Sequence, residues 1–423
     1  MRASLCVGIL LTGLSLPSLA QSSDPGTSTT HPGTQGSPVP QLQRHGSEDG
    51  ANPNRPVTAV TSKLTLDVVV TDATGNPVSG LQLQDFTVLD NKKAAKLASF
   101  QAATASAARA DSAVEILLVV DAINASYGNV ALAEDQIKLF LQRNGGRLAQ
   151  PVSIVFVSDS DPKTKDGASD PKSTMALQHR EAFVHRIPAS QDGSLLIKTL
   201  DKNGPTLHRI LEAQGKEGQS ERVRLSLVAL NFIATAEAAK PGRKILIYIS
   251  PGWPLMSESS AKTKEQLFDS VLYFSDILRD ARITLYNINP EGVTSAPPPS
   301  IDTSIGNPVL RGELMQTGMP SSVQANTGPG YYESFYKGVS TAKQASVNDL
   351  ALQVLAHQSG GLVLEGNNNI ERQIARCASE ANAFYVLSYD FPAAKSSDQY
   401  HDLEVRIDKP GLAARSRTGF YVR

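Results

Sequence analysis

An apolar run that ends in an acidic residue is the first feature of this chain that could support chemistry. Residues 114–120 form a hydrophobic stretch rich in β-branched side chains, and Asp121 follows it directly. Asn124 and Ser126 then add an amide and a hydroxyl. Carboxylate, amide and hydroxyl oxygens are the ligands that hard cations such as Mg²⁺ prefer. These three residues are therefore candidates for a binding loop at the end of a strand.

Two further candidates follow another apolar run, residues 243–249. Ser250 ends that run, and Trp253, the only tryptophan of the chain, stands in the same segment beside Gly252. An exposed tryptophan is a typical anchor of an interface, whereas a tryptophan packed beneath its own loop is equally common. Both interpretations of Trp253 stay open from the sequence.

The elements that must position these residues alternate between strand and helix patterns from residue 112 to residue 380. Strands are predicted at 114–120, 152–157, 243–250 and 283–288, with helices at 130–141, 193–200, 220–239, 265–279, 348–357 and 370–378. Continuous apolar strands are typical of a parallel sheet that is covered on both faces. The repeated units predict a doubly wound, Rossmann-type α/β domain with a mainly parallel sheet.

Residues 290–342 interrupt this alternation with a tract rich in Pro, Gly, Ser and Thr. Because such a length without core elements is unusual in a compact domain, we interpret it as a long flexible loop, with a functional excursion as the alternative. Short strand patterns flank the α/β region at residues 58–105 and 381–423. Each segment is too short for a core of its own. We expect them to pair into one small β-sandwich, with the α/β domain inserted between them.

The N-terminus predicts export. Residues 1–20 contain Arg2, an apolar core from Leu5 to Leu16 and a small-residue cleavage site ending at Ala20, the pattern of a signal peptide. The alternative, a membrane anchor, is disfavoured because this apolar run is too short to span a bilayer. Residues 21–57, rich in Ser, Thr, Gly, Pro and Gln, are predicted to be a disordered linker. We expect a periplasmic or secreted protein without a transmembrane anchor.

The composition and the missing motifs of the chain exclude several classes of function. The 423 residues, 40% of them hydrophobic, are enough for two or three domains. A formal net charge of −1 argues against nucleic-acid binding. Cys6 lies in the signal peptide, so Cys377 is left alone in a helical pattern and is interpreted as a buried structural thiol. The sequence contains no nucleophile-elbow, zinc-protease or phosphate-loop motif, so we expect no enzymatic activity.

Several segments together resemble a known bacterial family, the acidobacterial-type VWFA-related domain proteins, which contain a von Willebrand factor type A (VWA) domain. The segments that carry the resemblance, in order, are residues 69–78, 80–88, 119–124, 242–252, 355–361, 385–389 and 417–421. They extend over roughly residues 60 to 423. The resemblance implies an exported protein with a VWA-like domain and no established enzymatic activity.

The resemblance also implies a metal site, which this sequence lacks in part. A metal-binding VWA domain carries Asp-x-Ser-x-Ser on its first loop; Asp121 matches the acidic ligand, but Ile123 and Ala125 occupy the serine positions. The oxygens of Asn124 and Ser126 are one residue out of phase, and Pro251 stands where an acidic ligand would follow the later strand. We therefore expect a degenerate site without metal or other cofactor, in which the Asp121 carboxylate accepts backbone N–H bonds. Weak Mg²⁺ binding there, or weak Ca²⁺ binding in the Asp-rich loop 158–180, is the alternative.

The resulting functional hypothesis is an adhesion-type binding module that works without metal. Ligands of open α/β sheets bind outside the carboxyl ends of the strands, so the loops that contain Asp121, Asn124, Ser126, Ser250 and Trp253 are expected to contact a protein or an extracellular polymer. A structural or envelope-assembly protein that uses an exposed sandwich edge is the second hypothesis. An exported hydrolase is the third.

Overall fold

The computed structural model describes residues 62–104, 113–159, 182–207, 215–253, 261–291, 331–364, 369–391 and 398–422. All described residues belong to one compact unit. The predicted signal peptide, the linker and residues 292–330 of the predicted loop lie outside the described residues. Within the described part of the chain, no helix has the length and hydropathy needed to cross a membrane.

The central sheet has six strands in the order β10-β9-β8-β5-β6-β7. Their bounds are β5 Val114–Asp121, β6 Arg147–Ser158, β7 Phe183–Asp192, β8 Arg243–Ile249, β9 Ile283–Ile288 and β10 Val363–Leu364. Every neighbouring pair is parallel except β6 and β7, which is antiparallel. The prediction of a mainly parallel sheet in an α/β domain is confirmed at this level.

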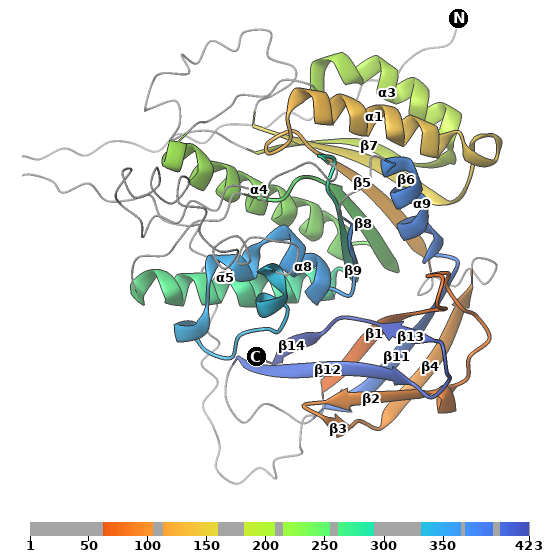
Figure 1. Cartoon of the computed structure of the whole chain (residues 1–423), viewed down its shortest axis with the longest axis vertical. Helices are drawn as coiled ribbons and strands as arrows, with labels where there is room; N and C mark the ends of the chain where they lie inside the picture. The colour runs from red at the N-terminus through yellow and green to blue at the C-terminus, as the bar shows by residue number, and fades with distance from the viewer. Residues whose placement is uncertain are drawn as a thin grey trace, which may run out of the picture. The chain divides into compact units, whose positions relative to one another are not determined.

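Helices cover both faces of this sheet, as Figure 1 shows. The helices are α1 Tyr127–Leu141, α3 Gly193–Leu207, α4 Gly215–Ala238, α5 Ala261–Asp280, α8 Leu352–Gln358 and α9 Ile370–Ser379. On one face α1, α3 and α9 pack against Ile116, Leu118 and Val120 of β5. On the other face α4, α5 and α8 pack against Leu117 and Val119. Since successive side chains of a strand point to opposite faces, the unbroken apolar run of β5 supplies both cores.

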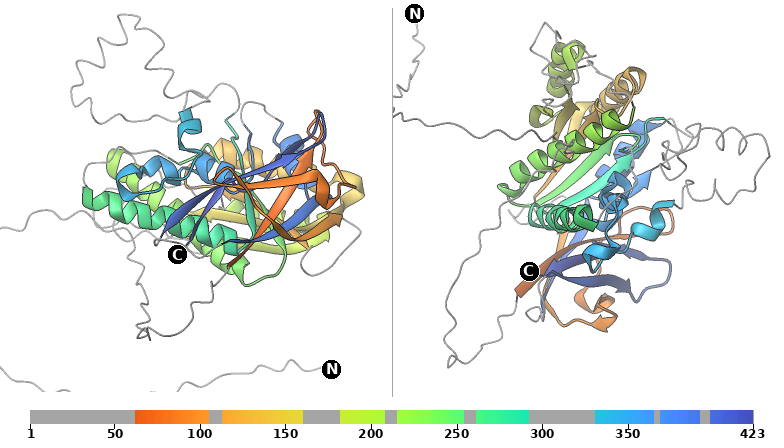
Figure 2. Two further views of the ribbon diagram at one scale, coloured as in Figure 1. Left: turned by 90° about the horizontal axis from the view of Figure 1, so that it is seen from below. Right: turned by 90° about the vertical axis from the view of Figure 1, so that its left-hand side faces the viewer.

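Two four-stranded antiparallel sheets contain the strands from both ends of the described chain, β13-β1-β11-β4 and β14-β12-β2-β3. The strands are β1 Ser62–Thr71, β2 Phe86–Asp90, β3 Lys93–Ala94, β4 Leu97–Thr104, β11 Ala383–Phe391, β12 Gln399–Ile407, β13 Ala413–Arg415 and β14 Gly419–Val422. β1 and β4 flank β11, and β2 pairs with β12. In Figure 2 the orange N-terminal strands and the dark blue C-terminal strands accordingly share the same sheets.

The inward residues of these two sheets form one apolar core, which includes Leu66, Val88, Tyr385 and Phe420. Neither the N-terminal nor the C-terminal segment holds that core alone, which explains why each looked too short to fold by itself. The predicted β-sandwich around an inserted α/β region is thus observed as two antiparallel sheets beside a mostly parallel one.

A buried ionic group joins the sandwich strands to the α/β region. Arg415 of β13 donates to Glu380 Oε1 at 2.5 Å and to the Gly360 carbonyl at 2.6 Å. Glu380, at the end of α9, also accepts from the Tyr286 hydroxyl of β9. Arg243 at the start of β8 reaches the same tyrosine oxygen at 3.4 Å. Because these charges are paired and hydrogen-bonded, their burial is tolerated.

The end of the predicted 290–342 loop departs from the prediction. Residues 331–335 and 342–344 form short 3-10 helices. Tyr332 is buried against Ala351 and Val354. The sequence signal failed here because a few aromatic residues inside a polar tract were enough to attach this segment to α8.

Candidate functional site

The carboxyl ends of four parallel strands meet at one edge of the central sheet. The register places Asp121 of β5 beside Val157 of β6, Val120 beside Ile249 of β8, and Ile249 beside Ile288 of β9. The loops that follow these strands therefore start next to each other. We call this edge, from which residues 121–127 and 250–253 emerge, the carboxyl edge.

Asp121 lies at the centre of this edge and its side chain is fully buried (0% exposed). Its Oδ1 accepts the backbone N–H groups of Ile123 at 2.9 Å and Asn124 at 3.1 Å. Its Oδ2 accepts the Asn124 side-chain amide at 2.8 Å and the Ser250 hydroxyl at 2.7 Å. The carboxylate thus binds its own loop and the loop after β8 with four hydrogen bonds.

Burial raises the pKa of Asp121 above its usual value, and the hydrogen bonds from Asn124, Ser250 and Ile123 act in the opposite direction. Burial, together with the nearby Asp121 charge, also raises the pKa of Tyr248, whose hydroxyl lies in the adjacent apolar core. Hydrogen bonds to the ionised carboxylate are what make such a buried acid tolerable.

The remaining predicted polar residues support this loop. Asn124 Nδ2 donates to Asp121 and also to Ser226 Oγ of α4 at 2.8 Å, which connects the loop to the helix layer. Ser250 Oγ donates to Asp121 and accepts the backbone N–H of Gly252 at 3.1 Å. The structure therefore brings Asp121, Asn124 and Ser250 together in one hydrogen-bonded group.

Ser126 has a separate role at the start of α1. Its side chain accepts the backbone N–H of Asn129 at 3.3 Å, so it is the N-cap of that helix. An N-cap serine satisfies one of the otherwise unpaired N–H groups of the first turn. Ser126 is exposed and its hydrogen bond is internal to the helix, so it does not join the Asp121 group.

Of the two interpretations that the sequence left open for Trp253, the structure shows the packed one. Its side chain is only 1% exposed and packs in the core that lies between the sheet and α4, α5 and α8. The indole stands edge-on to the Tyr248 ring at 6.2 Å. The turn before it depends on Gly252, whose φ of +100° is a backbone conformation that residues with a side chain rarely adopt. This turn directs the tryptophan inward, beneath its own loop.

The side chains present do not fit a magnesium ion at Asp121. N–H and O–H hydrogens point at both carboxylate oxygens, where a cation would have to lie. Ile123 and Ala125 are buried hydrocarbon. The side-chain oxygen of Asn124 is buried without a partner among the described residues, but a single amide oxygen is far from the six ligands that Mg²⁺ requires. Among the residues that the structure describes, no group of three or more His, Cys, Asp or Glu is placed to hold a metal.

One exposed residue at the carboxyl edge was missed by the sequence reasoning. Tyr127, the first residue of α1, is 60% exposed next to the buried Asp121 loop. A signal existed, because the first residue after an N-cap projects from a helix end.

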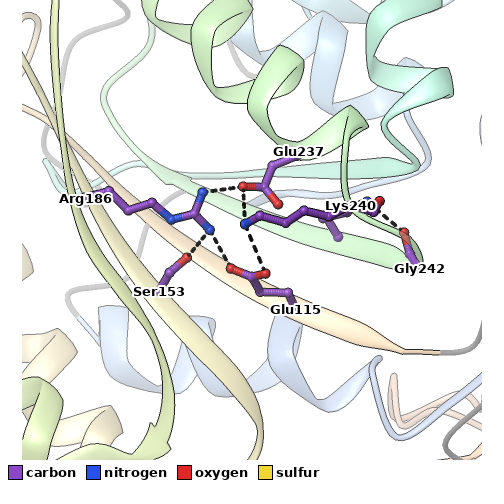
Figure 3. A network of polar contacts seen from close by, with 7 residues as sticks. Glu115, Ser153, Arg186, Glu237, Lys240 and Gly242 are labelled. Carbon is purple, nitrogen blue, oxygen red and sulfur yellow. Dashed lines mark hydrogen bonds and ion pairs between the residues drawn. The ribbon is translucent and has the colours of Figure 1, made fainter. Parts of the chain in front are cut away.

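A network of ion pairs lies at the opposite end of the sheet, where the parallel strands begin (Figure 3). Arg186 of β7 donates to Glu237 of α4 and, at 2.5 Å, to Glu115 of β5. Lys240 lies 3.0 Å from Glu237 and 3.4 Å from Glu115. Glu237 is fully buried, so these partners are what keeps its charge in place. We interpret this network as structural, because its acidic groups are turned toward basic side chains of the chain itself.

No protein-family model matches the chain, and no curated protein matches it in sequence. Among solved structures, it is similar to the pilus adhesin SpaC from Lactobacillus rhamnosus GG in its open conformation, with 10% identity and a TM-score of 0.30 over 88% of this chain and 48% of the adhesin chain. A second SpaC crystal form gives 9% identity and a TM-score of 0.32, over 82% and 48% of the two chains. The chain spans about half the length of the adhesin, and scores this low establish no common fold.

Proposed function

We propose that this chain is an exported, non-enzymatic binding module with a VWA-like α/β domain. It contacts a protein or an extracellular polymer through the loops of the carboxyl edge, without a metal ion between the two partners. Export is supported by the signal pattern of residues 1–20, and the VWA-like assignment by the sequence motifs together with the six-stranded sheet.

The proposal that binding needs no metal rests on Asp121, whose carboxylate is not accessible to an ion. A metal-dependent site needs carboxylate oxygens that are open toward the loops. Here both oxygens accept hydrogen bonds inside the protein, and the side chain has no exposed surface. Asp121 thus acts as the hydrogen-bonded centre that holds residues 122–126 against the loop after β8.

The absence of enzymatic activity is proposed on the state of the strongest nucleophile candidate. Cys377 is buried in the core beneath α9, and burial raises the pKa of its thiol far above the usual value. A nucleophilic cysteine requires the opposite, an accessible thiol with a lowered pKa. The hydrolase hypothesis therefore has no support from the described residues.

Thermal unfolding with and without metal tests the metal-independent reading. Melting temperatures in 1 mM EDTA and in millimolar Mg²⁺, Mn²⁺ or Ca²⁺ should agree within experimental error, because a ligand stabilises a protein only by binding its folded state. A rise in melting temperature with one of these ions that disappears in Asp121→Asn would overturn the proposal.

Recognition at the carboxyl edge is tested with Tyr127→Ala. The matched control is Phe232→Ala, because Phe232 is an aromatic residue of α4 with nearly the same exposure, 61% against 60%. Affinity capture from envelope extracts, followed by quantitative comparison of each captured protein or polymer, should show a loss with Tyr127→Ala alone. Equal recovery with both variants and with the wild type would remove this edge as the binding surface.

One observation favours the assembly hypothesis as a second candidate. β4, with the sequence LASFQAAT, stands at the end of its sheet and pairs only with β11 among the described strands. It carries no charge and no proline, the features that usually protect an edge strand from pairing with another chain. Light scattering of the wild type and of Ala98→Lys distinguishes the assembly hypothesis from the binding module. A concentration-dependent oligomer that Ala98→Lys abolishes would favour assembly, and a wild type that stays monomeric at all concentrations would count against it.

A further inference from the structure

A polar groove lies where the first turn of the sandwich meets the end of the α/β region. It encloses about 580 Å³. Its polar lining comes from the turn after β1, from the residues that follow α1 and from one face of α9, and includes Thr71, Thr74, Arg143, Arg372, Arg376 and Ser379. α1 begins at the carboxyl edge and runs back across the sheet, so Arg143 and the groove lie at the opposite end from Asp121.

The lining of this groove carries more positive than negative charge. Its lining residues carry three guanidinium groups and one carboxylate, that of Asp72. Arg143 is held by Glu371 at 2.6 Å. Arg372 and Arg376 take part in no ion pair with any other described residue, and both are exposed. Two guanidinium groups therefore face this groove with their donors available.

α9 fixes the spacing of these two arginines. The helix buries Ile370, Ile374 and Cys377 in the core of the α/β region. Arg372 and Arg376 are four residues apart on the other side, so their Cβ atoms are neighbours on the helix surface, roughly 5–6 Å apart. An arginine pair in this arrangement suits a ligand that presents two oxyanions at a similar distance, each of which accepts paired N–H bonds from one guanidinium.

The facing wall of the groove is a rigid turn. Asp72 Oδ1 accepts the Thr74 and Asn76 backbone N–H groups, each at 2.9 Å, and the Thr74 hydroxyl at 2.6 Å. The single acidic group of the groove is thus engaged by its own turn. Gly75 has a φ of +83°, and a Cβ there would lie 3.5 Å from Arg376 Nη2, so this guanidinium extends across to the turn.

We propose that this groove binds a polyanionic ligand, a chain that carries two or more oxyanion groups about one helical turn apart, with Arg372 and Arg376 as its principal contacts. Arg143, positioned by Glu371, and the hydroxyls of Thr74 and Ser379 complete the site. The groove is separate from the carboxyl edge, so this inference does not rest on the proposed function.

Isothermal titration calorimetry of the full chain tests the groove with three probes at 50 mM NaCl: tripolyphosphate for phosphates, oligogalacturonate for carboxylates and a heparin hexasaccharide for sulfates. At least one probe should bind the wild type, and Arg372→Gln/Arg376→Gln should weaken that binding at least tenfold. Because both side chains are exposed, the melting temperature of this variant should equal that of the wild type. The three probes identify which oxyanion the groove prefers.

Two further variants separate a built site from general attraction. Lys93→Gln/Lys96→Gln removes the same charge from exposed residues that do not line the groove, and should change affinity less than twofold. Arg372→Lys/Arg376→Lys keeps the charge but removes the forked donors, and should weaken binding severalfold. The proposal is overturned if no probe binds the wild type, if the Lys93/Lys96 variant loses as much as the Gln pair, or if the lysine pair binds as well as the wild type.

Discussion

Replacing Asp121 with asparagine changes one buried atom and tests whether this residue is the structural centre of the carboxyl edge. Asparagine keeps the shape but offers one oxygen in place of two, and its new NH₂ group faces the donors of Asn124 and Ser250. The Ser250 hydroxyl can rotate, whereas the Asn124 amide has no such freedom because it also donates to Ser226. At least one buried donor is therefore left without an acceptor.

The expected loss follows from these contacts. A buried donor or acceptor left unsatisfied costs about 1–3 kcal/mol, and hydrogen bonds to a charged group are worth about 1.5–3 kcal/mol each. Part of this is regained because the variant no longer buries a charge, and burial opposes ionisation of Asp121. We expect Asp121→Asn to lower the free energy of unfolding by about 2–4 kcal/mol, a large share of the roughly 5–15 kcal/mol typical of a domain.

Urea unfolding at pH 7 measures this loss by circular dichroism and by the fluorescence of Trp253, which lies beside the same loops. The control is Asp390→Asn, an exposed position of β11, which should change the free energy by less than about 0.5 kcal/mol. A double-mutant cycle with Ser250→Ala should give a coupling energy between the two side chains of about 0.5–3 kcal/mol. A loss with Asp121→Asn as small as that of the control, or additive effects of Asp121 and Ser250, would refute the structural role.

Three further outcomes follow from buried or half-buried groups. Arg186→Met leaves the fully buried Glu237 with one basic partner fewer and should lower the free energy of unfolding by about 2–4 kcal/mol, measured in urea. Adding Glu237→Gln to this variant removes the unpaired charge and should restore part of the lost stability. If the double variant is no more stable than Arg186→Met, the ionic explanation is contradicted. Trp253→Phe should cost about 1–3 kcal/mol in urea unfolding because the smaller ring packs less well, and no hydrogen bond is lost because the indole N–H has no partner among the described residues. A variant that keeps its stability but loses partner binding would contradict the buried position of Trp253. Burial lowers the pKa of His357 in the folded protein, so the unfolded chain takes up a proton more readily, and the free energy of unfolding should fall as the pH drops below about 6.5. His357→Gln should make the free energy of unfolding depend less on pH between pH 7.5 and 5.5. An unchanged pH dependence would exclude His357 as its source.

The sheet could be predicted because its strands bury both faces. Residues 114–120 and 243–249 are so continuously apolar that only a doubly covered strand accommodates them, and β5 and β8 lie at these positions. β7 gave a much weaker signal, since residues 183–192 alternate only in part and include Pro188. Its length and its antiparallel direction depend on pairing with β6, which local sequence does not encode.

The candidate site could be predicted only where it is local. The backbone contacts of Asp121 lie within three residues of it, and an aspartate at a strand end commonly accepts such bonds. The burial of Trp253 depends on Tyr248 and on helices distant in sequence, so the sequence left it open. The arginine groove combines residues 71–76, 143 and 372–379, and no spacing along the chain indicates that they meet.

The two candidate surfaces make opposite demands on ionic conditions, and this difference assigns any future ligand to one of them. Binding at the carboxyl edge relies on exposed side chains such as Tyr127 around a carboxylate that is already hydrogen-bonded, so EDTA and moderate salt should change it little. Binding in the groove replaces counterions around Arg372 and Arg376, so its affinity should fall steeply between 50 and 300 mM NaCl, since exposed charges are screened over about 10 Å at 0.1 M salt. A ligand that resists salt but is lost with Tyr127→Ala belongs to the carboxyl edge; one that is released by salt and by the Arg372/Arg376 variant belongs to the groove.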